Sequence, residues 1–557
     1  MAFEWINDNS RKFLNAGYLT GNESVEERIK DVCDAAENTL KIEGFSEKMY
    51  DYMGKGWISL SSPIWSNFGK DRGLPISCFS SYVPDNTSGI LFAQSEVGIM
   101  SKMGGGTSGY FGDIRPRGSE IKDSGKTSGS VHFMELFEGV TNVISQGGVR
   151  RGYFAASLPI EHGDIEEFLE IGTEGHPIQT MNTAVTVTDQ WIEEMVAGDK
   201  EKRKVWAKLL KTRSEIGYPY IFFHDNVQRN RPDVYKDKEM VVKNSNLCHE
   251  VLLPTNDEES FVCDLASVNM FYYDDWKNTD LVETVIYFLD AVMTEFIDKL
   301  EEYRDSDSKQ DRMTFTYMER AYNFAVNHRA LGLGVLGWHS LLQSKMLPFA
   351  SDESNALADE AFKLIQKKSY KASRELAEMF GEPELLKGYG RRNTTLNAIA
   401  PTTSSAFILG QVSQSIEPLM SNYYIKDLAK LKAEVKNQFL EELLDDKGHN
   451  TKEVWESIAK NDGSVQHLKF LSEYEKQVFL TFSEIDSNDI IEQAAIRQQY
   501  LDQTQSLNLR IPSNLNPKEI NKIVLNAWEL GICTLYYQHG ANAAQQFARA
   551  NCSVCES

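Results

Sequence analysis

The spacing of apolar residues changes along the chain and divides it into stretches of different predicted structure. Within residues 1–56, apolar residues recur every three or four positions among charged ones, as at Val32 and Ala36, which predicts helices. From residue 57 to about 163 the pattern changes to short apolar runs broken by Gly, Ser and Pro, which is typical of strands joined by tight connections. We expect a loop-rich functional core in this second stretch.

Farther along the chain, helical patterns alternate with strand-like segments, which favours an α/β core. Helices are expected at residues 165–171, 189–216, 279–303, 313–328, 355–380, 489–503 and 517–530. Strand-like composition occurs at 258–270 and 396–400. Residues 427–480 are charge-rich and amphipathic, which predicts a helical insertion on the surface. The end of the chain is rich in Ala, Gln and Asn and predicts a flexible tail.

Composition is that of an ordinary globular protein and narrows the choice of partners. Of the 557 residues, 41% are hydrophobic and 25% are charged, which argues against a disordered or fibrous protein. The formal net charge of −23 disfavours general nucleic-acid binding, because such binding depends on Lys and Arg neutralising phosphates. No run of about 18 apolar residues occurs, and the N-terminus lacks the layout of a secretory signal. We expect a cytoplasmic protein with no membrane or nucleic-acid partner.

Seven cysteines are too few and too scattered for a disulfide scaffold in a chain of this length. Cys248 lies in the segment Asn246-Leu-Cys-His-Glu250. If this segment is extended, the side chains of Asn246, Cys248 and Glu250 project to one side. A lone buried cysteine is more often a small core residue. A thiol flanked by an amide and a potential general base, however, suggests catalysis.

Cys552 and Cys555 form a C-x-x-C motif close to the end of the chain. A structural zinc site would need two more ligands, and neither a second cysteine pair nor a close histidine pair accompanies the motif. The favoured interpretation is a dithiol on a flexible tail that exchanges electrons with a disulfide elsewhere in the protein.

Three further motifs each have an ordinary and a functional interpretation. The glycines at 332, 334 and 337 have the G-x-G-x-x-G spacing, but a helical pattern precedes them, so tight backbone packing is favoured over a dinucleotide site. Tyr536 and Tyr537 are suited either to aromatic packing or to stepwise radical transfer, and the motif alone leaves both open. The hydroxyl cluster at 402–405 follows an apolar run and is well placed to bind phosphate.

Together, these motifs resemble the large catalytic subunit of class I ribonucleotide reductases. Any one match is weak, but eight of them occur in the family's order between residue 57 and the C-terminus. They are Pro75-Ile-Ser-Cys78, Ser145-Gln-Gly-Gly-Val-Arg150, Ser245-Asn-Leu-Cys-His-Glu250 with Leu253-Pro-Thr255, Cys263-Asp-Leu-Ala-Ser-Val-Asn269, Arg392-Asn393 with Pro401-Thr-Thr-Ser-Ser405, Asp502-Gln-Thr-Gln-Ser-Leu-Asn508, Leu535-Tyr-Tyr-Gln538 and the cysteine pair at 552 and 555.

The resemblance implies a fold and a division of the chain. The fold would be an α/β, ten-stranded barrel over residues 57–538, with a central finger loop that carries Cys248. A short helical region at 1–56 would precede the barrel, and a redox tail at 539–557 would follow it. Family members often carry an N-terminal ATP-cone domain that controls overall activity. Residues 1–56 contain no basic nucleotide-binding motif, so a compact form without the cone is expected.

The resemblance also implies radical chemistry on ribonucleotides. Cys248 resembles the thiol that becomes a thiyl radical and removes the 3′ hydrogen of the substrate. Glu250 would act as the base on the 3′-hydroxyl, and Asn246 would hold that hydroxyl. Cys78 and Cys263 would supply two reducing equivalents and end as a disulfide.

Further residues match the family's electron-transfer and nucleotide sites. Cys552 and Cys555 would re-reduce the disulfide, and Tyr536 and Tyr537 would pass the radical to Cys248. The residues expected to hold the substrate, mainly its phosphates, are Ser62, Ser77, Thr402, Thr403, Ser404 and Ser405. Those expected in the allosteric specificity site or its relay loop at 145–152 are Asp85, Arg115, Ser145, Gln146 and Arg150.

The partners follow from the same resemblance. The chain would form a homodimer and receive its radical from a metal-containing, ferritin-like small subunit. It would be re-reduced by thioredoxin or glutaredoxin and would respond to deoxynucleoside triphosphate or ATP specificity effectors. No metal site and no tightly bound cofactor are expected in the chain itself.

Two alternatives remain at this stage. A cobalamin-dependent class II reductase shares the three core cysteines and the tail dithiol, but it makes its radical within one chain, and the adjacent tyrosines argue against it. A non-catalytic nucleotide-binding or thiol-exchange protein would leave the arrangement of Asn246, Cys248 and Glu250 unexplained.

Overall fold

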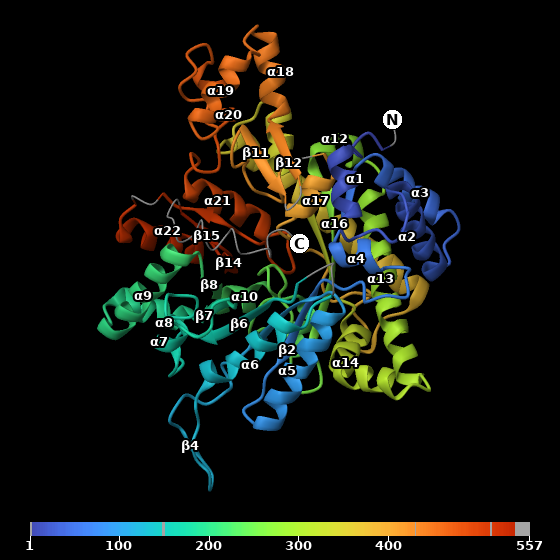
Figure 1. Cartoon of the computed structure of the whole chain (residues 1–557), viewed down its shortest axis with the longest axis vertical. Coiled ribbons are helices and arrows are strands. Elements are labelled where there is room, and N and C mark those ends of the chain that lie inside the picture. The colour runs from blue at the N-terminus through green and yellow to red at the C-terminus, as the bar shows by residue number, and fades with distance from the viewer. Residues whose placement is uncertain (1–2, 147–150, 411, 429–430, 513–514, 541–557) are drawn as a thin grey trace.

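A rolled β-sheet forms the centre of the protein, and helices pack around it (Figure 1). The computed structural model describes residues 3–146, 151–410, 412–428, 431–512 and 515–540. The main sheet has nine strands among these residues. The predicted α/β class is therefore confirmed.

One half of the sheet consists of parallel strands joined by helical crossovers. Its strands pair in the order β2 (Cys78–Tyr82), β3 (Gly106–Tyr110), β6 (Phe154–Pro159), β7 (Asn182–Val187) and β8 (Tyr220–Phe223). The strands are buried along nearly their whole length, as parallel strands covered by helices usually are. The crossovers contain α5 (Thr87–Lys102), α6 (Ser130–Val143), α7 (Ile165–Phe168), α8 (Asp189–Ala197) and α9 (Lys200–Ile216).

The other half begins with β9 (Phe261–Asn269), which runs antiparallel to β2. On its far edge β9 pairs in parallel with β10 (Leu331–Leu336), and near its end it also pairs with β1 (Ile58–Leu60). From β10 the ring continues through isolated bridges that join Leu333 to Asn397 and Ile399 to Gln505. It then reaches β13 (Leu509–Arg510), β15 (Gln538–His539) and β14 (Thr534–Leu535).

The ring closes because β14 pairs antiparallel with β8. The barrel therefore consists of two sets of parallel segments, and the chain direction in one set is opposite to that in the other. In the second set, the segments near residues 397 and 505 are joined by single bridges and not by regular strand pairing. The barrel is therefore observed, while the count of ten regular strands stays a prediction.

Glycines 332 and 334 lie within β10 and allow the barrel segments to approach closely. A Cβ atom on Gly334 would lie 2.5 Å from the backbone oxygen of Ala398, and one on Gly332 would lie 2.3 Å from the side chain of Leu265. These contacts support the interpretation of the glycine motif as tight backbone packing.

The first part of the chain is helical, as its apolar spacing predicts. It contains α1 (Asp8–Asn15), α2 (Val25–Leu40) and α3 (Phe45–Gly54). A capping box between Ser24 and Glu27 fixes the start of α2. The proposed domain boundaries at 56 and 538 stay predictions.

Long helices cover the second half of the barrel, in agreement with the predicted helical patterns. They are α13 (Leu281–Asp305), α14 (Lys309–His328), α16 (Asp352–Phe380), α21 (Ser487–Gln498) and α22 (Pro517–Glu529). Shorter helices are α10 (His224–Asn230), α11 (Asp233–Asp237), α12 (Tyr273–Trp276) and α15 (Trp338–Ser344). None of the helices in the described part of the chain has the length and apolarity needed to cross a membrane.

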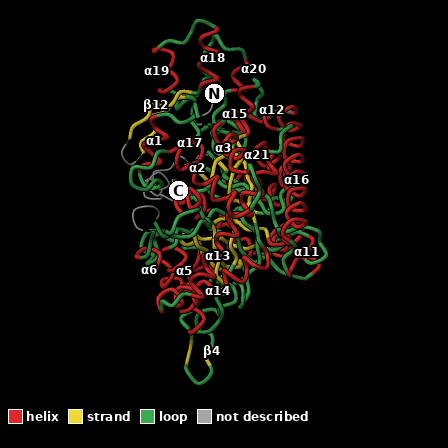
Figure 2. Tube along the Cα trace, turned by 90° about the vertical axis from the view of Figure 1, so that its right-hand side faces the viewer, coloured by secondary structure: helices red, strands yellow, loops and turns green. Residues whose placement is uncertain are grey.

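The predicted surface insertion has its own small core. It contains α18 (Gln438–Asp446), α19 (Lys452–Lys460) and α20 (Glu473–Val478), whose apolar faces meet around Leu440, Trp455 and Phe479. A hairpin of β11 (Tyr423–Leu428) and β12 (Leu431–Lys436), which the helical prediction missed, precedes these helices. The insertion lies at the opposite end of the molecule from the projecting hairpin of β4 (Glu120–Ile121) and β5 (Gly125–Lys126), as Figure 2 shows.

A buried ionic network ties the long helices to the barrel. Asp290 on α13 accepts hydrogen bonds from Arg329 Nε and Arg392 Nε, each at 2.9 Å, and from Asn393 Nδ2 at 3.0 Å. Burial alone would raise the pKa of Asp290, but the two guanidinium groups lower it below its ordinary value. The carboxylate thereby anchors the chain that leads into the barrel segment near residue 397.

We expect Asp290→Asn to lower the free energy of unfolding by about 3 kcal/mol, because it leaves the buried guanidinium of Arg329 and the half-buried one of Arg392 without their counter-charge. Urea unfolding near neutral pH measures this change. The exposed Asp305→Asn is the control and should have no measurable effect. In the wild-type protein, the contribution of Asp290 should be lost as the pH falls through its lowered pKa. Equal stability of the two variants would contradict this role.

Candidate active site

Residues 244–253, here called the finger loop, lie inside the barrel. Asn244 Nδ2 donates to Ser80 Oγ of β2 at 2.8 Å, and Leu247 packs on Ala155 of β6. From the other half, Thr534 Oγ1 donates to the carbonyl oxygen of His249 at 2.9 Å. Contacts with both halves of the ring place the loop in its centre, as the family resemblance implies.

Residues 246–250 are not extended, which the shared side of Asn246, Cys248 and Glu250 would have required, because the chain turns there. The side-chain oxygen of Asn246 accepts hydrogen bonds from the backbone N–H groups of Glu250 and Val251, both at 3.0 Å. His249 has a φ of 67°, in the left-handed region. An asparagine side chain readily closes a turn in this way. The turn leaves the Asn246 amide group to donate to Cys78 Sγ at 3.1 Å.

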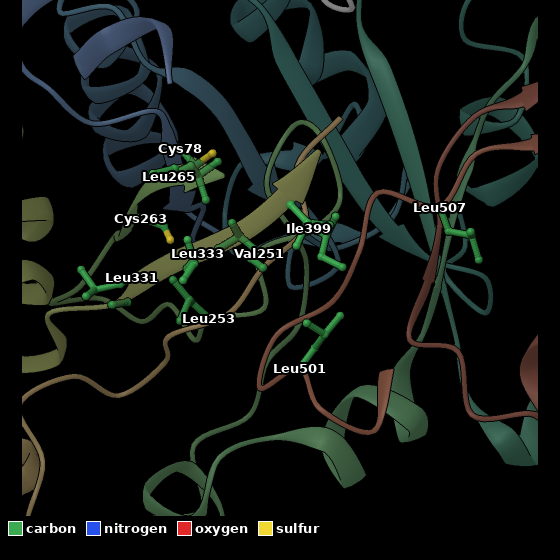
Figure 3. Packing of buried hydrophobic residues seen from close by; sticks show 14 of the residues in the cluster. Cys78, Val251, Leu253, Cys263, Leu265, Leu331, Leu333, Ile399, Leu501 and Leu507 are labelled. Atoms are coloured by element: carbon green, nitrogen blue, oxygen red, sulfur yellow. The ribbon is translucent and has the colours of Figure 1, made fainter. Parts of the chain in front are cut away.

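Cys78 and Cys263 lie directly opposite each other where β2 and β9 pair antiparallel. They are partners in the strand register, and Figure 3 shows them next to Leu265 and Leu333 in the same part of the core. Directly opposed residues in antiparallel strands have Cα atoms about 4.5–5.5 Å apart. That separation falls within the roughly 4.4–6.8 Å range that a disulfide spans. Both cysteines are free thiols in this structure.

The environment keeps these two thiols protonated. Burial raises the pKa of Cys78, and the nearby groups of Glu250, Cys248 and Cys263 raise it further. Burial likewise raises the pKa of Cys263, with a further contribution from Asp264. The pair is thus suited to donate hydrogen and electrons as thiols, in contrast to a thiolate nucleophile.

The segment at 502–508 holds the finger loop from one side. Ser506 Oγ donates to the carbonyl oxygen of Cys248 at 2.5 Å and lies 3.2 Å from Glu250 Oε2. Gln503 accepts from the Leu252 N–H at 3.1 Å, and its amide nitrogen lies 4.0 Å from Cys263 Sγ. The family motif at 502–508 includes both Gln503 and Ser506, but the sequence alone assigned no role to them.

Tyr536 and Tyr537 belong to a buried aromatic cluster that also contacts Cys248. Their ring centroids are 4.5 Å apart, and Tyr220 lies 4.6 Å from Tyr536 and 5.0 Å from Tyr537. Asn182 Nδ2 donates to the hydroxyl oxygens of Tyr220 and Tyr537 at 2.8 and 2.9 Å. Tyr220 and Asn182 were missed from the sequence because their partners lie on distant parts of the chain.

The structure brings two of the predicted substrate-binding elements together, Ser62 and the hydroxyl cluster at 402–405. Ser62 is the first residue of α4 (Ser62–Asn67), and 403–405 begin α17 (Thr403–Ile408). Ser405 Oγ donates to the carbonyl oxygen of Leu60, two residues before Ser62, at 3.4 Å. Thr402 accepts a hydrogen bond from the Ser415 N–H through its hydroxyl at 2.7 Å. Ser77 is buried next to Cys78.

The predicted specificity residues are only partly brought together. Arg115 Nε and Asp85 Oδ2 form a half-exposed ion pair at 2.7 Å. Gln146 instead donates to Asn67 at 3.0 Å, and Ser145 is exposed. Arg150, Cys552 and Cys555 lie outside the described residues.

Within the described part of the chain, no group of three or more His, Cys, Asp or Glu side chains is arranged to hold a metal ion.

Comparison with known proteins agrees with this arrangement. The family model described as ribonucleotide reductase, barrel domain, matches residues 76–202, 193–388 and 383–538. The class Id ribonucleotide reductase alpha subunit of Actinobacillus ureae is 52% identical, with a TM-score of 0.90 over 98% of this chain and 99% of that chain.

Two viral relatives are similar over most of their length. The putative ribonucleoside-diphosphate reductase large subunit of Frog virus 3 is 35% identical over 88% of this chain and 87% of the viral protein. The ribonucleoside-diphosphate reductase large subunit of Invertebrate iridescent virus 3 is 30% identical over 92% of each chain. The chain therefore belongs to the ribonucleotide reductase large-subunit family.

Proposed function

We propose that this chain is the catalytic subunit of an enzyme that reduces ribonucleoside diphosphates to 2′-deoxyribonucleotides. The observation that carries the proposal is the direct pairing of Cys78 with Cys263 inside the barrel, beside the loop that carries Cys248. Relatives named ribonucleoside-diphosphate reductase support the reaction class and the diphosphate substrate.

The proposed reaction gives each side chain of the site a role. A thiyl radical on Cys248 removes the 3′ hydrogen of the ribose, and the carboxylate of Glu250 accepts the 3′-hydroxyl proton. Asn246 holds the hydroxyl in place. The 2′-hydroxyl then leaves as water, and two electrons with two hydrogens come from Cys78 and Cys263, which become a disulfide. Finally, Glu250 returns the proton to the 3′ oxygen, and Cys248 returns a hydrogen to C3′, which regenerates its radical.

Burial of the site supports radical chemistry. Asn246 and Glu250 are each only 1% exposed, and Cys248 between them is half-buried, so most of the loop is shielded from water. Exclusion of water protects a reactive intermediate from side reactions. The raised pKa values of Cys78 and Cys263 also keep hydrogen on sulfur until the reaction requires it.

The radical would come from a partner and pass through the tyrosine pair. In each step one electron and one proton leave a phenol or a thiol, and the previous radical becomes a phenol. The close rings of Tyr536 and Tyr537, and the contact of Cys248 with their cluster, support this route. The similarity to a class I alpha subunit supports a separate, ferritin-like small subunit with a metal centre as the source.

Re-reduction and regulation complete the proposal. Cys552 and Cys555 would reduce the Cys78–Cys263 disulfide by thiol exchange and be recharged by thioredoxin or glutaredoxin. A deoxynucleoside triphosphate or ATP would bind near Asp85 and Arg115 and act through the loop at 145–152.

The chain would also form a homodimer. Apolar side chains exposed on α5 and α6, including Leu91, Leu136 and Val143, are suited to burial in its interface.

The two alternatives are less favoured. A cobalamin-dependent enzyme would not need a buried tyrosine pair next to the radical cysteine. A non-catalytic thiol-exchange or nucleotide-binding protein would not need Asn246 and Glu250 beside three buried or half-buried thiols.

We expect Cys248→Ser to reduce turnover to the assay background while nucleotide binding stays unchanged. A serine O–H bond is much stronger than a cysteine S–H bond, so the radical cannot move to this position. The assay measures deoxynucleotide formation with the small subunit present. Cys33→Ser, which changes a buried cysteine on α2, should retain activity. Substantial turnover by Cys248→Ser would overturn the proposed function.

Tyr536→Phe and Tyr537→Phe should each abolish turnover without weakening substrate binding. Phenylalanine preserves the aromatic packing but is far harder to oxidise than tyrosine. Steady-state assays and equilibrium binding of substrate measure the two effects separately. Tyr287→Phe, which removes a hydroxyl bonded to Glu375 between α13 and α16, is the control and should remain active. Normal activity in both test variants would refute the radical route.

A further inference from the structure

The N-terminal helix α1 packs directly on the predicted phosphate-binding segment. Ser10 Oγ of α1 donates to the carbonyl oxygen of Ile408 at 2.6 Å, and the ring of Phe13 lies 5.5 Å from that of Phe407. Both partners belong to α17, whose first turn carries 403–405. The helical N-terminal region thus packs against the predicted substrate region.

Tyr18, just after α1, reaches the same region with its hydroxyl group. Tyr18 Oη lies 3.1 Å from Ser62 Oγ, and no other side-chain hydrogen bond competes for the Ser62 hydroxyl in the described structure. The ring of Tyr18 stacks on Phe13 with centroids 5.6 Å apart, and Arg72 donates to the Tyr18 carbonyl oxygen at 3.3 Å. Ring and backbone are therefore both held in place.

We infer that Tyr18 is a positioning residue for the substrate's phosphates and that it acts through Ser62. The inference rests on the proposed function and on the expectation from the family resemblance that Ser62 contacts a phosphate group of the substrate. A hydroxyl has one hydrogen to donate and lone pairs to accept. A phosphate oxygen only accepts, so Ser62 must donate to it. The Tyr18 hydroxyl can then donate to Ser62 Oγ, which fixes the direction of the Ser62 hydrogen.

The hydrogen bond from Tyr18 should influence the affinity for substrate but not the rate of the chemical steps. The phosphates are remote from the ribose carbons that react, so loss of the Tyr18 hydroxyl should weaken binding equally in the ground and transition states. The N-terminal region would thereby form one wall of the substrate site.

The test is Tyr18→Phe, which keeps the stacked ring and removes only the hydroxyl. With CDP as substrate and the small subunit present, we expect KM to rise about three- to tenfold while kcat is unchanged, a size typical for one hydrogen bond between neutral groups. Equilibrium binding of CDP should weaken by the same factor. Binding of cytidine, which lacks phosphates, should be unchanged.

A double-mutant cycle shows whether Tyr18 acts through Ser62. If it does, Tyr18→Phe combined with Ser62→Ala should bind CDP no more weakly than Ser62→Ala alone. Tyr52→Phe is the matched control, because its hydroxyl also belongs to the N-terminal helices but bonds to Asp280. This control should leave KM and kcat unchanged.

Failure of this inference is distinguishable from failure of the proposed function. Unchanged CDP binding in Tyr18→Phe, or additive losses in the cycle, would overturn the role of Tyr18 while turnover by the wild-type enzyme still supports ribonucleotide reduction. A fall in kcat with unchanged CDP affinity would also overturn it. Turnover by Cys248→Ser, in contrast, would contradict the proposed function whatever Tyr18 does.

Discussion

The antiparallel pairing of β2 with β9 sets Cys78 directly opposite Cys263, and the rest of the site is arranged around this pair. The two strands belong to different halves of the barrel, so the pair sits where the halves meet. Strand register fixes the distance between the two residues, and a disulfide can form there with little movement of the backbone. Burial in the surrounding core raises the pKa of both thiols and keeps them protonated until they react.

A polar loop inside a barrel is stable only if its hydrogen-bonding groups find partners. Part of this requirement is met by Asn246 of the finger loop, whose oxygen closes the turn and whose amide donates to Cys78 Sγ. The segment at 502–508 supplies further partners, with Ser506 on the carbonyl oxygen of Cys248 and Gln503 on the backbone of Leu252. The same bonds that allow the loop to be buried also set the positions of the reactive side chains. Stability and function therefore depend on the same contacts.

Local pattern predicted much of the fold but not the pairing that builds the site. The N-terminal and barrel-covering helices were predictable because their apolar spacing is local. The shared side of Asn246, Cys248 and Glu250 depended on an extended segment, and the hydrogen bond from the Glu250 N–H to the Asn246 side chain closes a turn there that residue spacing does not reveal. Asn182 and Tyr537 are hydrogen-bonded across 355 residues, and Ser506 and Glu250 across 256. Contacts this distant follow from the ring topology and leave no local signal. The three core cysteines were found through their family motifs, while their side-by-side arrangement required the structure.

The most direct test of this account counts the disulfides made by a single round of reduction. The tail variant Cys552→Ser with Cys555→Ser, pre-reduced and freed of external reductant, would be mixed with the small subunit, effector and CDP, then quenched and alkylated. Peptide mass spectrometry would locate and quantify any disulfide. The account predicts one Cys78–Cys263 disulfide for each deoxynucleotide formed. Formation of deoxynucleotide with Cys78 and Cys263 both recovered as alkylated thiols would contradict it.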